Sequence, residues 1–417
     1  MPSTPLPSPL SRPTLSAHQE LVHRLAQARR RHPGGRLVAG HHNVNHIVRL
    51  GWPLALSLGV RPFWTRGKFR TPLDAVEVVP RVWARESDVL SVVSRYLPRT
   101  PRCLAESEEW SLHAWIPGRA LAEINPTGRV GPATMSAFAA FFAGVAGVPL
   151  DQLPPLPPDW PEEGDSDGFL NWLTDFAEHR VHRPGRRRFG ALFDAVLIPR
   201  DAMPSFRRTR PPLTRRPFAL LHTDVHRANV VVGRGPVRGR ARLTVIDWEL
   251  AMVGDVLHDL ATHLVRMDYD EEDRTRMTRA WTEAMREAGH GPMTEGLADD
   301  LPVLLAFEYA QSVYADVMRA ALSLPESPAD AEYEEAARRV CRAMSRARQP
   351  LRLDRVPGER AAEEALRDWH AHAHATDAAR RSRLAGTAGT GPIGSIGSIG
   401  PIGPIGSPAA AVHAAAG

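Results

Sequence analysis

The sequence predicts an α+β fold, in which a small β-rich lobe is followed by a larger and mostly helical lobe. Short β-branched runs separated by turns extend from Arg36 to about Trp115, a pattern typical of strands. After Pro117-Gly118, large apolar residues recur every three or four positions, which is typical of helices with one buried face. This change of pattern places the linker between the lobes near residues 111–118.

In the small lobe, β-branched runs predict strands at Asn45–Leu50 and Val76–Val82. A helix should follow, because Val89, Leu90 and Val93 fall on one helical face.

Four apolar stripes predict the core helices of the large lobe. The second stripe follows a capping Asp165-Ser166-Asp167 cluster, and Gly289 should end the third. The stripes are Met135/Phe138/Phe142/Val145, Phe169/Trp172/Leu173/Phe176, Met277/Trp281/Met285 and Phe307/Tyr314/Met318.

The two ends of the chain set the expected domain boundaries. Residues 1–16 are rich in Pro and Ser and are interpreted as a flexible leader without a signal-peptide core. The β-rich, nucleotide-binding lobe is expected at 17–116, the helical lobe at 117–350, and a helical extension at 351–383. In residues 384–417, Gly recurs at every third position from Gly391 to Gly406. This repeat is too short to sustain a collagen-like triple helix, so we expect a disordered tail.

The composition limits the classes of protein. The chain has 417 residues and a net charge of +5. Its arginine clusters lie among Pro and Gly without interleaved aromatic rings, so no nucleic-acid partner is expected. The 2 cysteines are far apart, which indicates neither a disulfide framework nor a metal site. The longest uncharged stretch, Val130–Leu150, is mostly Ala, Gly and Phe and predicts a buried helix rather than a membrane span. We expect a cytoplasmic protein, and the oligomeric state stays open.

A short segment with strand patterns, inside the helical part, contains the candidate functional residues. Phe218–Leu221 is apolar and leads into a loop from His222 to Asn229. Val230–Val232 and Leu243–Ile246 read as two further strands, joined by a turn-rich segment. If these two pair as a hairpin, Asn229 at the start of one lies beside Asp247 at the end of the other.

Asp224 lies on the loop before Asn229, so three oxygen-bearing side chains should converge on one site. Phosphoryl transfer needs such a set. One carboxylate orients the acceptor hydroxyl and takes its proton, while an amide oxygen and a second carboxylate hold Mg²⁺ against the phosphates.

The residues of this segment resemble a known family. His222-Thr223-Asp224-Val225-His226-Arg227-Ala228-Asn229 and Ile246-Asp247-Trp248-Glu249 are similar to the Brenner and metal motifs of the aminoglycoside phosphotransferase/choline kinase family. Gly254-Asp255 and Asp259-Leu260-Ala261 resemble the segment that follows. The likeness implies a protein kinase-like two-lobe fold over roughly Arg36 to Met318. Thr223 replaces the usual glycine of the motif, and Arg227-Ala228 replaces its Pro-Gly.

The resemblance implies roles for individual residues. Asp224 would be the catalytic base, and His222 would fix the loop beside it. Asn229 and Asp247 would be the Mg²⁺ ligands. Support of the loop would come from His226 and Asp259.

The nucleotide side requires a turn over the phosphates, a cation on a strand and an acid on the next helix. The turn is expected at Gly40–Asn45, with Asn43 inside it. Arg81 is a candidate cation held by Glu86, and Lys68 is its rival. By the resemblance, the hinge at His113 and Ala114 would meet the adenine of ATP, or the base of GTP, through backbone groups.

The acceptor is expected to be a hydroxyl-bearing small molecule. The acidic run Asp268, Asp270 and Glu271 would suit a polycationic aminoglycoside, and the family likeness implies antibiotic resistance as one role. The same run equally suits the N-terminus of a helix, where acids complement the dipole.

Two alternative functions remain. The alternating His222, Asp224 and His226 could bind Zn²⁺ or two metal ions, as in a hydrolase. The further ligands of such a site would be Asp247, His258 and Asp259. The departures from the family motifs suit a kinase-like binding protein without turnover.

Overall fold

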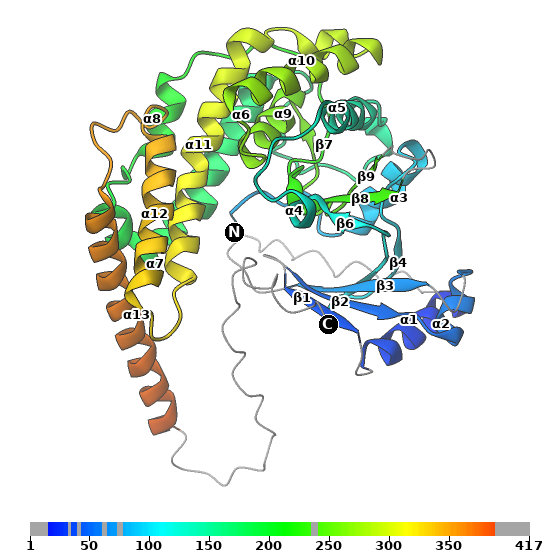
Figure 1. Ribbon diagram of the computed structural model, residues 1–417, viewed down its shortest axis with the longest axis horizontal. Coiled ribbons are helices and arrows are strands. Elements are labelled where there is room, and N and C mark those ends of the chain that lie inside the picture. The colour runs from blue at the N-terminus through cyan, green and yellow to red at the C-terminus, as the bar shows by residue number, and fades with distance from the viewer. Residues whose placement is uncertain are drawn as a thin grey trace, which may run out of the picture. The chain divides into compact units, whose positions relative to one another are not determined.

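The computed structural model describes residues 16–31, 35–39, 43–60, 65–72, 78–234 and 241–387. Packing divides the chain into two compact units. The smaller comprises Met1–Ala75 and Pro98–Gly118, and the larger comprises Val76–Leu97 and Arg119–Gly417. The smaller unit is built around a sheet and the larger one is mostly helical, so the predicted α+β class is confirmed (Figure 1).

The smaller unit contains one antiparallel sheet in the order β1-β2-β3-β5-β4. Its core consists of apolar side chains from the strands, from helices α1 and α2 and from the turn before β5, including Val48, Leu54, Phe69, Trp110 and Leu112. The elements are α1 (Ala17–Arg30), β1 (Arg36–Ala39), β2 (Asn43–Arg49), α2 (Trp52–Ser57), β3 (Arg66–Pro72), β4 (Cys103–Glu106) and β5 (Ser111–Ala114).

One predicted strand is wrong and another was missed. Residues 78–82 form no strand, although Val76–Val82 was expected to be one, and residues 76 and 77 lie outside the described part. Pro80 explains the difference, because proline lacks the N–H that a sheet ladder needs. In this part of the chain the strand is β3, which lies earlier. Its residues Arg66–Pro72 include three basic residues and few apolar ones, so they show no strand pattern.

The larger unit is built from helices. Figure 1 shows α11, α12 and α13 running side by side. The helices are α3 (Glu86–Tyr96), α4 (Leu121–Ile124), α5 (Pro132–Ala146), η1 (Leu150–Gln152), α6 (Ser166–Phe176), η2 (Ala177–His182), α7 (Arg183–Ala195), α8 (Ala202–Thr209), η3 (Arg227–Asn229), α9 (Val256–Arg266), α10 (Glu271–Glu287), η4 (Gly291–Thr294), α11 (Leu297–Leu322), α12 (Asp330–Ala347) and α13 (Glu359–Thr387).

Two small antiparallel sheets stand among these helices. One pairs β7 (Ala219–Leu221) with β10 (Met252–Gly254). The other has the order β6-β8-β9, with β6 (Arg119–Ala120), β8 (Val230–Arg234) and β9 (Ala241–Val245). They present the loops that follow β7 and β9, and both loops carry motif residues.

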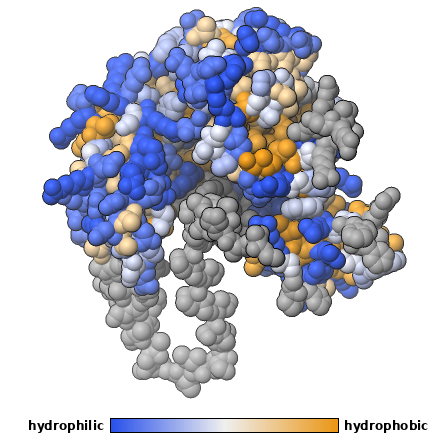
Figure 2. Space-filling model, viewed as in Figure 1, coloured by the Kyte–Doolittle hydropathy of each residue, from blue (hydrophilic) through white to orange (hydrophobic). Residues whose placement is uncertain are grey.

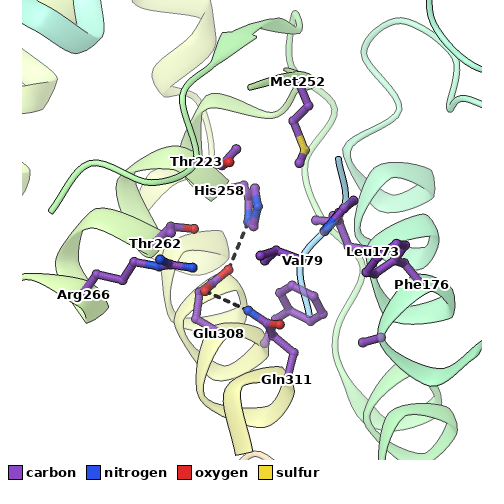
Figure 3. A pocket seen from close by; sticks show the side chains of 13 residues that line it. Val79, Leu173, Phe176, Thr223, Met252, His258, Thr262, Arg266, Glu308 and Gln311 are labelled. Carbon is purple, nitrogen blue, oxygen red and sulfur yellow. Dashed lines mark hydrogen bonds and ion pairs between the residues drawn. The ribbon is translucent and has the colours of Figure 1, made fainter. Parts of the chain in front are cut away.

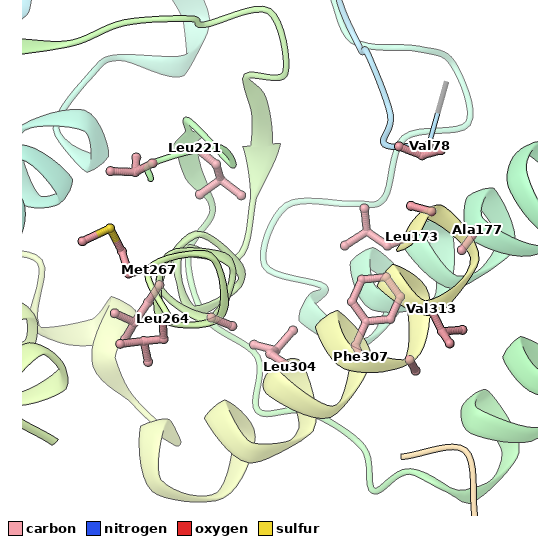
Figure 4. Close-up of a cluster of buried hydrophobic side chains, with 14 of the residues drawn as sticks. Val78, Leu173, Ala177, Leu221, Leu264, Met267, Leu304, Phe307 and Val313 are labelled. Carbon is pink, nitrogen blue, oxygen red and sulfur yellow. The ribbon is translucent and has the colours of Figure 1, made fainter. Parts of the chain in front are cut away.

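The predicted apolar stripes lie in the core of the larger unit. Phe138, Phe169, Trp281 and Phe307 are all buried, on α5, α6, α10 and α11. Figure 4 shows part of this cluster, in which Phe307 lies among side chains from several helices. The predicted start of α6 and the predicted end of α10 are also confirmed. The Asp165 side chain caps α6, and Gly289 follows α10 with a φ of 84°.

The surface and the chain ends complete the description. On the face shown in Figure 2, the surface over α11 and α12 is largely hydrophilic. Along the described segments, no helix combines the length and the apolar character needed to cross a membrane. Helix α13 extends to Thr387, past the predicted start of the tail, and residues 388–417 lie outside the described part, as does the leader up to residue 15.

Candidate active site

The predicted hairpin forms and brings the two metal-motif residues together. Val230 pairs with Val245 in the antiparallel ladder of β8 and β9. One step beyond the ladder, the Ile246 N–H donates to the Asn229 carbonyl at 2.9 Å. Asp247 is the next residue, so backbone pairing holds Asn229 beside it.

The Asp224 carboxylate is held from three sides. Asn229 Nδ2 donates to its Oδ2 at 2.7 Å, and His226 Nε2 lies 3.4 Å from its Oδ1. The Arg266 guanidinium, at the end of α9, also donates to Oδ1. Burial favours the neutral acid, but the charge of Arg266 and the His226 ring outweigh burial and lower the pKa of Asp224 to about 2. Asp224 is therefore an oriented carboxylate at neutral pH.

Asp259 braces the loop from the first turns of α9. Its Oδ2 accepts from the His222 N–H at 2.9 Å, and its Oδ1 accepts from the Thr223 N–H at 2.8 Å. Burial raises the pKa of Asp259 to about 6, against the effect of these two hydrogen bonds. The His222 ring packs against Trp248 and accepts from the Asp224 N–H at 3.3 Å. Burial lowers the pKa of His222 to about 4, so the ring is neutral.

Two motif residues adopt the left-handed backbone conformation. Thr223 has a φ of 60° and Asp247 has a φ of 74°. This region is unfavourable for residues with a Cβ, and most of all for a β-branched one. The Thr223 hydroxyl partly compensates by donating to the Leu250 carbonyl at 2.7 Å. The structure thus explains why glycine is usual at this place in the motif and how threonine is accommodated.

The second departure from the motif is accommodated by a side chain. Arg227 donates to the Asn125 and Gly128 carbonyls, both at 2.8 Å. These bonds tie the loop to the end of α4, while the His226 ring accepts from the Ala228 N–H at 3.3 Å. The loop keeps a defined path without the family's Pro-Gly.

Asn229 and Asp247 have the donor chemistry for Mg²⁺. Because the amide nitrogen of Asn229 is directed at Asp224, its amide oxygen is available for a hard cation. Asp247 supplies a carboxylate on the neighbouring backbone position. Two protein oxygens suit Mg²⁺, which takes its other ligands from phosphates and water.

Arg81 and Glu86 both contact the segment after Asp247. The Arg81 guanidinium lies 3.3 Å from the Glu249 carboxylate. Glu86, the first residue of α3, accepts from the Trp248 N–H at 2.9 Å. Both residues belong to the larger unit and contact the segment that follows Asp247.

Lys68, rather than Arg81, is the cation on a strand. It lies on β3, the middle strand of the five, and pairs with Ile47 on one side and His113 on the other. Arg81 lies in the irregular segment before α3. The structure therefore corrects the strand assignment on which Arg81 was preferred.

The other nucleotide-side candidates lie at the sheet as well. His113 and Ala114 are on β5, and the Ala114 N–H donates to the Arg102 carbonyl at 2.8 Å. The Ala114 N–H is therefore engaged within the smaller unit. Asn43 is the first residue of β2. The rest of its expected turn, residues 40–42, lies outside the described part.

The acidic run after the metal motif is engaged locally. Asp270 caps α10 by accepting from the Asp273 N–H at 2.7 Å, and Glu271 is the first residue of that helix. Asp268 pairs with Arg346 at 2.6 Å.

Arg266 is the main site residue that the sequence did not reveal. It follows Asp259 by seven residues, which is two helical turns, so both side chains lie on one side of α9. A search for a basic residue at that spacing would have found it. Arg266 and Thr223 also line a small cavity with residues of α9 and α11 (Figure 3).

The hydrolase alternative gains no support from the geometry. Among the residues that the structure describes, no three His, Cys, Asp or Glu side chains are grouped to hold a metal ion. His222 and His258 are buried in packing instead of facing Asp224 and Asp247 together as ligands.

The chain is also similar in sequence to a known family. A sequence profile of the Phosphotransferase enzyme family matches residues 70–293, more than half of the chain. Comparison with curated proteins finds no match.

Several solved structures are similar at low identity. An ethanolamine kinase from Plasmodium vivax is 11% identical, with a TM-score of 0.45 over 76% of this chain and 81% of its own. A macrolide 2′-phosphotransferase from Brachybacterium faecium is 16% identical, with a TM-score of 0.44 over 77% and 98%. A putative aminoglycoside phosphotransferase from Ralstonia eutropha is 13% identical, with a TM-score of 0.47 over 84% and 97%.

Proposed function

The chain belongs to the Phosphotransferase enzyme family, and on that premise we propose that it transfers the γ-phosphate of ATP or GTP to a hydroxyl of a small molecule. The observation that carries this proposal is the convergence of Asp224, Asn229 and Asp247. Asp224 is hydrogen-bonded to Asn229, and Asn229 is paired by its backbone to the residue before Asp247.

Asp224 is proposed as the group that faces the acceptor. Arg266 and Asn229 fix its two carboxylate oxygens, so the acceptor hydroxyl meets an oriented hydrogen-bond acceptor. A pKa of about 2 makes Asp224 a weak base. It would therefore align the hydroxyl first and take its proton late, when the loose transition state has raised the acidity of that hydroxyl.

Asn229 and Asp247 would hold Mg²⁺, which supplies positive charge that offsets the charge of the phosphates. Glu86 and Arg81 would keep the metal motif in place through Trp248 and Glu249. Lys68 is the proposed phosphate-binding cation, because it is a lysine on the middle strand of the sheet.

The acceptor class is proposed only as a hydroxyl-bearing small molecule, and an aminoglycoside or another antibiotic is one candidate. Since Asp268 and Asp270 are engaged in an ion pair and a helix cap, they give limited support to a polycationic acceptor.

Two measurements test the proposal. Calorimetry with ATP and GTP should show binding that strengthens when Mg²⁺ is added. A phosphate-transfer screen should then cover aminoglycosides, macrolides, amino-alcohols and nucleosides with both nucleotides. Failure to bind either nucleotide, together with tight Zn²⁺ binding, would instead favour the hydrolase. Binding without transfer to any acceptor or to water would favour the binding protein without turnover.

A further inference from the structure

A buried polar cluster lies next to Arg266, the residue that donates to Asp224. His258, Thr262 and Arg266 are spaced four residues apart on α9, so they share one helical face. Glu308 and Gln311 face them from α11 (Figure 3). Helix α11 begins at Leu297 and lies beyond the 70–293 segment that matches the family profile. The side chains that α11 contributes therefore lie outside the segment matched by the family profile.

The cluster encloses a cavity of about 20 Å³. Its apolar wall includes Leu173, Phe176 and Phe307. A cavity of this size holds one water molecule, and a water needs two to four polar partners. An acceptor molecule is far too large for it.

Three buried polar atoms at the cavity have no well-formed hydrogen bond. His258 Nδ1, Thr262 Oγ1 and Glu308 Oε1 are buried and make no hydrogen bond within the described part of the chain. His258 Nδ1 and Glu308 Oε1 lie 3.3 Å apart. The second oxygen of Glu308 accepts from Gln311 Nε2 at 3.2 Å. Orphaned polar atoms are costly in a protein interior, and a bridging water removes that cost.

We propose that this cavity holds one ordered water bridging His258, Thr262 and Glu308, and that Glu308 is a positioning residue which orients Asp224 through Arg266. The proposal rests on the proposed phosphotransferase function. Arg266 borders the cavity and also donates to Asp224. When the cluster is filled and hydrogen-bonded, Arg266 has a fixed wall to pack against. When it is not, the guanidinium loses that wall and the Asp224 carboxylate rotates.

The test compares three variants. Glu308→Leu removes both oxygens, and Glu308→Gln keeps an oxygen that still accepts from the water. Glu178→Gln is the matched control, because Glu178 is another buried glutamate paired with a histidine, at 3.0 Å from His182, and it does not border the cavity. All three should lower stability, so stability alone does not separate them.

The readout is phosphate release from Mg-ATP or Mg-GTP, with water in place of the unidentified acceptor. For Glu308→Leu we expect kcat to fall roughly 10- to 100-fold, the cost of a displacement of about 1 Å at the reacting group, while KM for the nucleotide stays unchanged. Glu308→Gln should recover most of the loss, and Glu178→Gln should keep the wild-type kcat. With Arg266→Met, the added Glu308→Leu change should have no further effect, because the two act in series.

Two outcomes overturn the proposal: a normal kcat in Glu308→Leu, or losses in Glu308→Leu and Arg266→Met that multiply. A crystal structure of the wild-type protein gives a second, activity-independent test. It should contain the water, and that of Glu308→Leu should show a rotated Asp224 carboxylate. If the wild type releases no phosphate, the proposed function fails, and the crystal structures still decide this proposal. A dry cavity in the wild type refutes it.

Discussion

The catalytic loop and the strand that carries Lys68 are held in different ways. The loop from His222 to Asn229 is fixed by side chains that reach it from other elements, above all Asp259 and Arg266. Lys68 is fixed by backbone pairing of β3 with β2 and β5. The loop and Asp259 stand in a recognisable stretch of sequence, whereas no motif marks Arg266. The backbone pairing of β3 accepts its basic and polar residues, so this strand leaves little trace in the sequence.

The largest effect is expected for Asp224→Asn. This change keeps the size of the side chain and one acceptor oxygen, but the amide cannot take a proton. Turnover should fall roughly 10²- to 10⁴-fold, the range for lost general-base catalysis. Nucleotide affinity should stay within a few-fold of wild type. Single-turnover phosphate transfer and nucleotide titration on the same variant measure both quantities.

Asp247→Asn is the control for this prediction. It removes a charge that would neutralise the metal, so nucleotide affinity in Mg²⁺ and turnover should fall together. Near-normal turnover in Asp224→Asn would remove the main support for the active-site assignment.

The second prediction concerns Lys68 on β3, the strand that is held by backbone pairing. Lys68→Ala should weaken nucleotide affinity roughly 10- to 100-fold, the size of a lost charged hydrogen bond. Arg81→Ala should weaken it less, because Arg81 acts through Glu249. Calorimetry in saturating Mg²⁺ measures both. If Arg81→Ala has the larger effect, the phosphate-binding cation is Arg81 and the role of β3 has been misread.

The third prediction uses the histidines that are buried around the braced loop. Burial lowers the pKa of His222 and His263 to about 4 and that of His258 to about 3. The unfolded chain binds protons at these residues below about pH 6.5, whereas the folded protein does not, so stability falls as the pH drops through that value. Each histidine should cost about 2 kcal/mol at pH 5 relative to pH 7.5.

Asp259 opposes this trend. Its pKa is raised to about 6, so the folded protein takes up that proton first and gains stability below pH 6. Burial also raises the pKa of Asp255 and Glu308, which act in the same direction as Asp259. The contribution of one histidine is therefore isolated by urea unfolding of the wild type and a histidine variant at the two pH values. His263→Gln retains a donor for the Val225 carbonyl, 2.8 Å from His263 Nδ1, and should remove about one of the three contributions. An equal pH dependence in the wild type and in His263→Gln would contradict the assigned burial of His263.

The sequence predicted the family, the α+β class and the hairpin because each depends on local pattern. Val230 and Val245 pair as the alternation of the strands implies, and this puts Asn229 beside Asp247. The strand β3 was missed because its residues, from Arg66 to Pro72, are mostly basic or polar. A basic strand of this kind gains its conformation from its neighbours in the sheet.

Arg266 was missed for a different reason. Its role depends on where α9 lies relative to the catalytic loop, which is a contact between residues 42 positions apart. The same holds for Glu308 on α11. Long-range contacts between a charged residue and a motif leave no periodic signal, since neither residue is apolar or part of a turn.

The smallest expected effect is at Thr223, where the braced loop departs from its family. In most positions glycine is less stable than alanine by roughly 0.5–1 kcal/mol, because glycine loses more backbone freedom on folding. At a φ of 60° the order should reverse, since a Cβ in the left-handed region costs about 1–2 kcal/mol. Thr223→Ala loses the bond to Leu250 and keeps that strain, so it should destabilise the protein by about 1 kcal/mol. Thr223→Gly loses the same bond but relieves the strain, so it should stay close to wild type.

Thr174 is the matched control for Thr223. Its hydroxyl also donates to a carbonyl, that of Leu170, at 2.7 Å, but it lies within the regular helix α6. There Thr174→Gly should be less stable than Thr174→Ala. Urea unfolding of the four variants checks the inversion, and the ordinary order at both positions would show that Thr223 does not adopt the left-handed conformation that the catalytic loop requires.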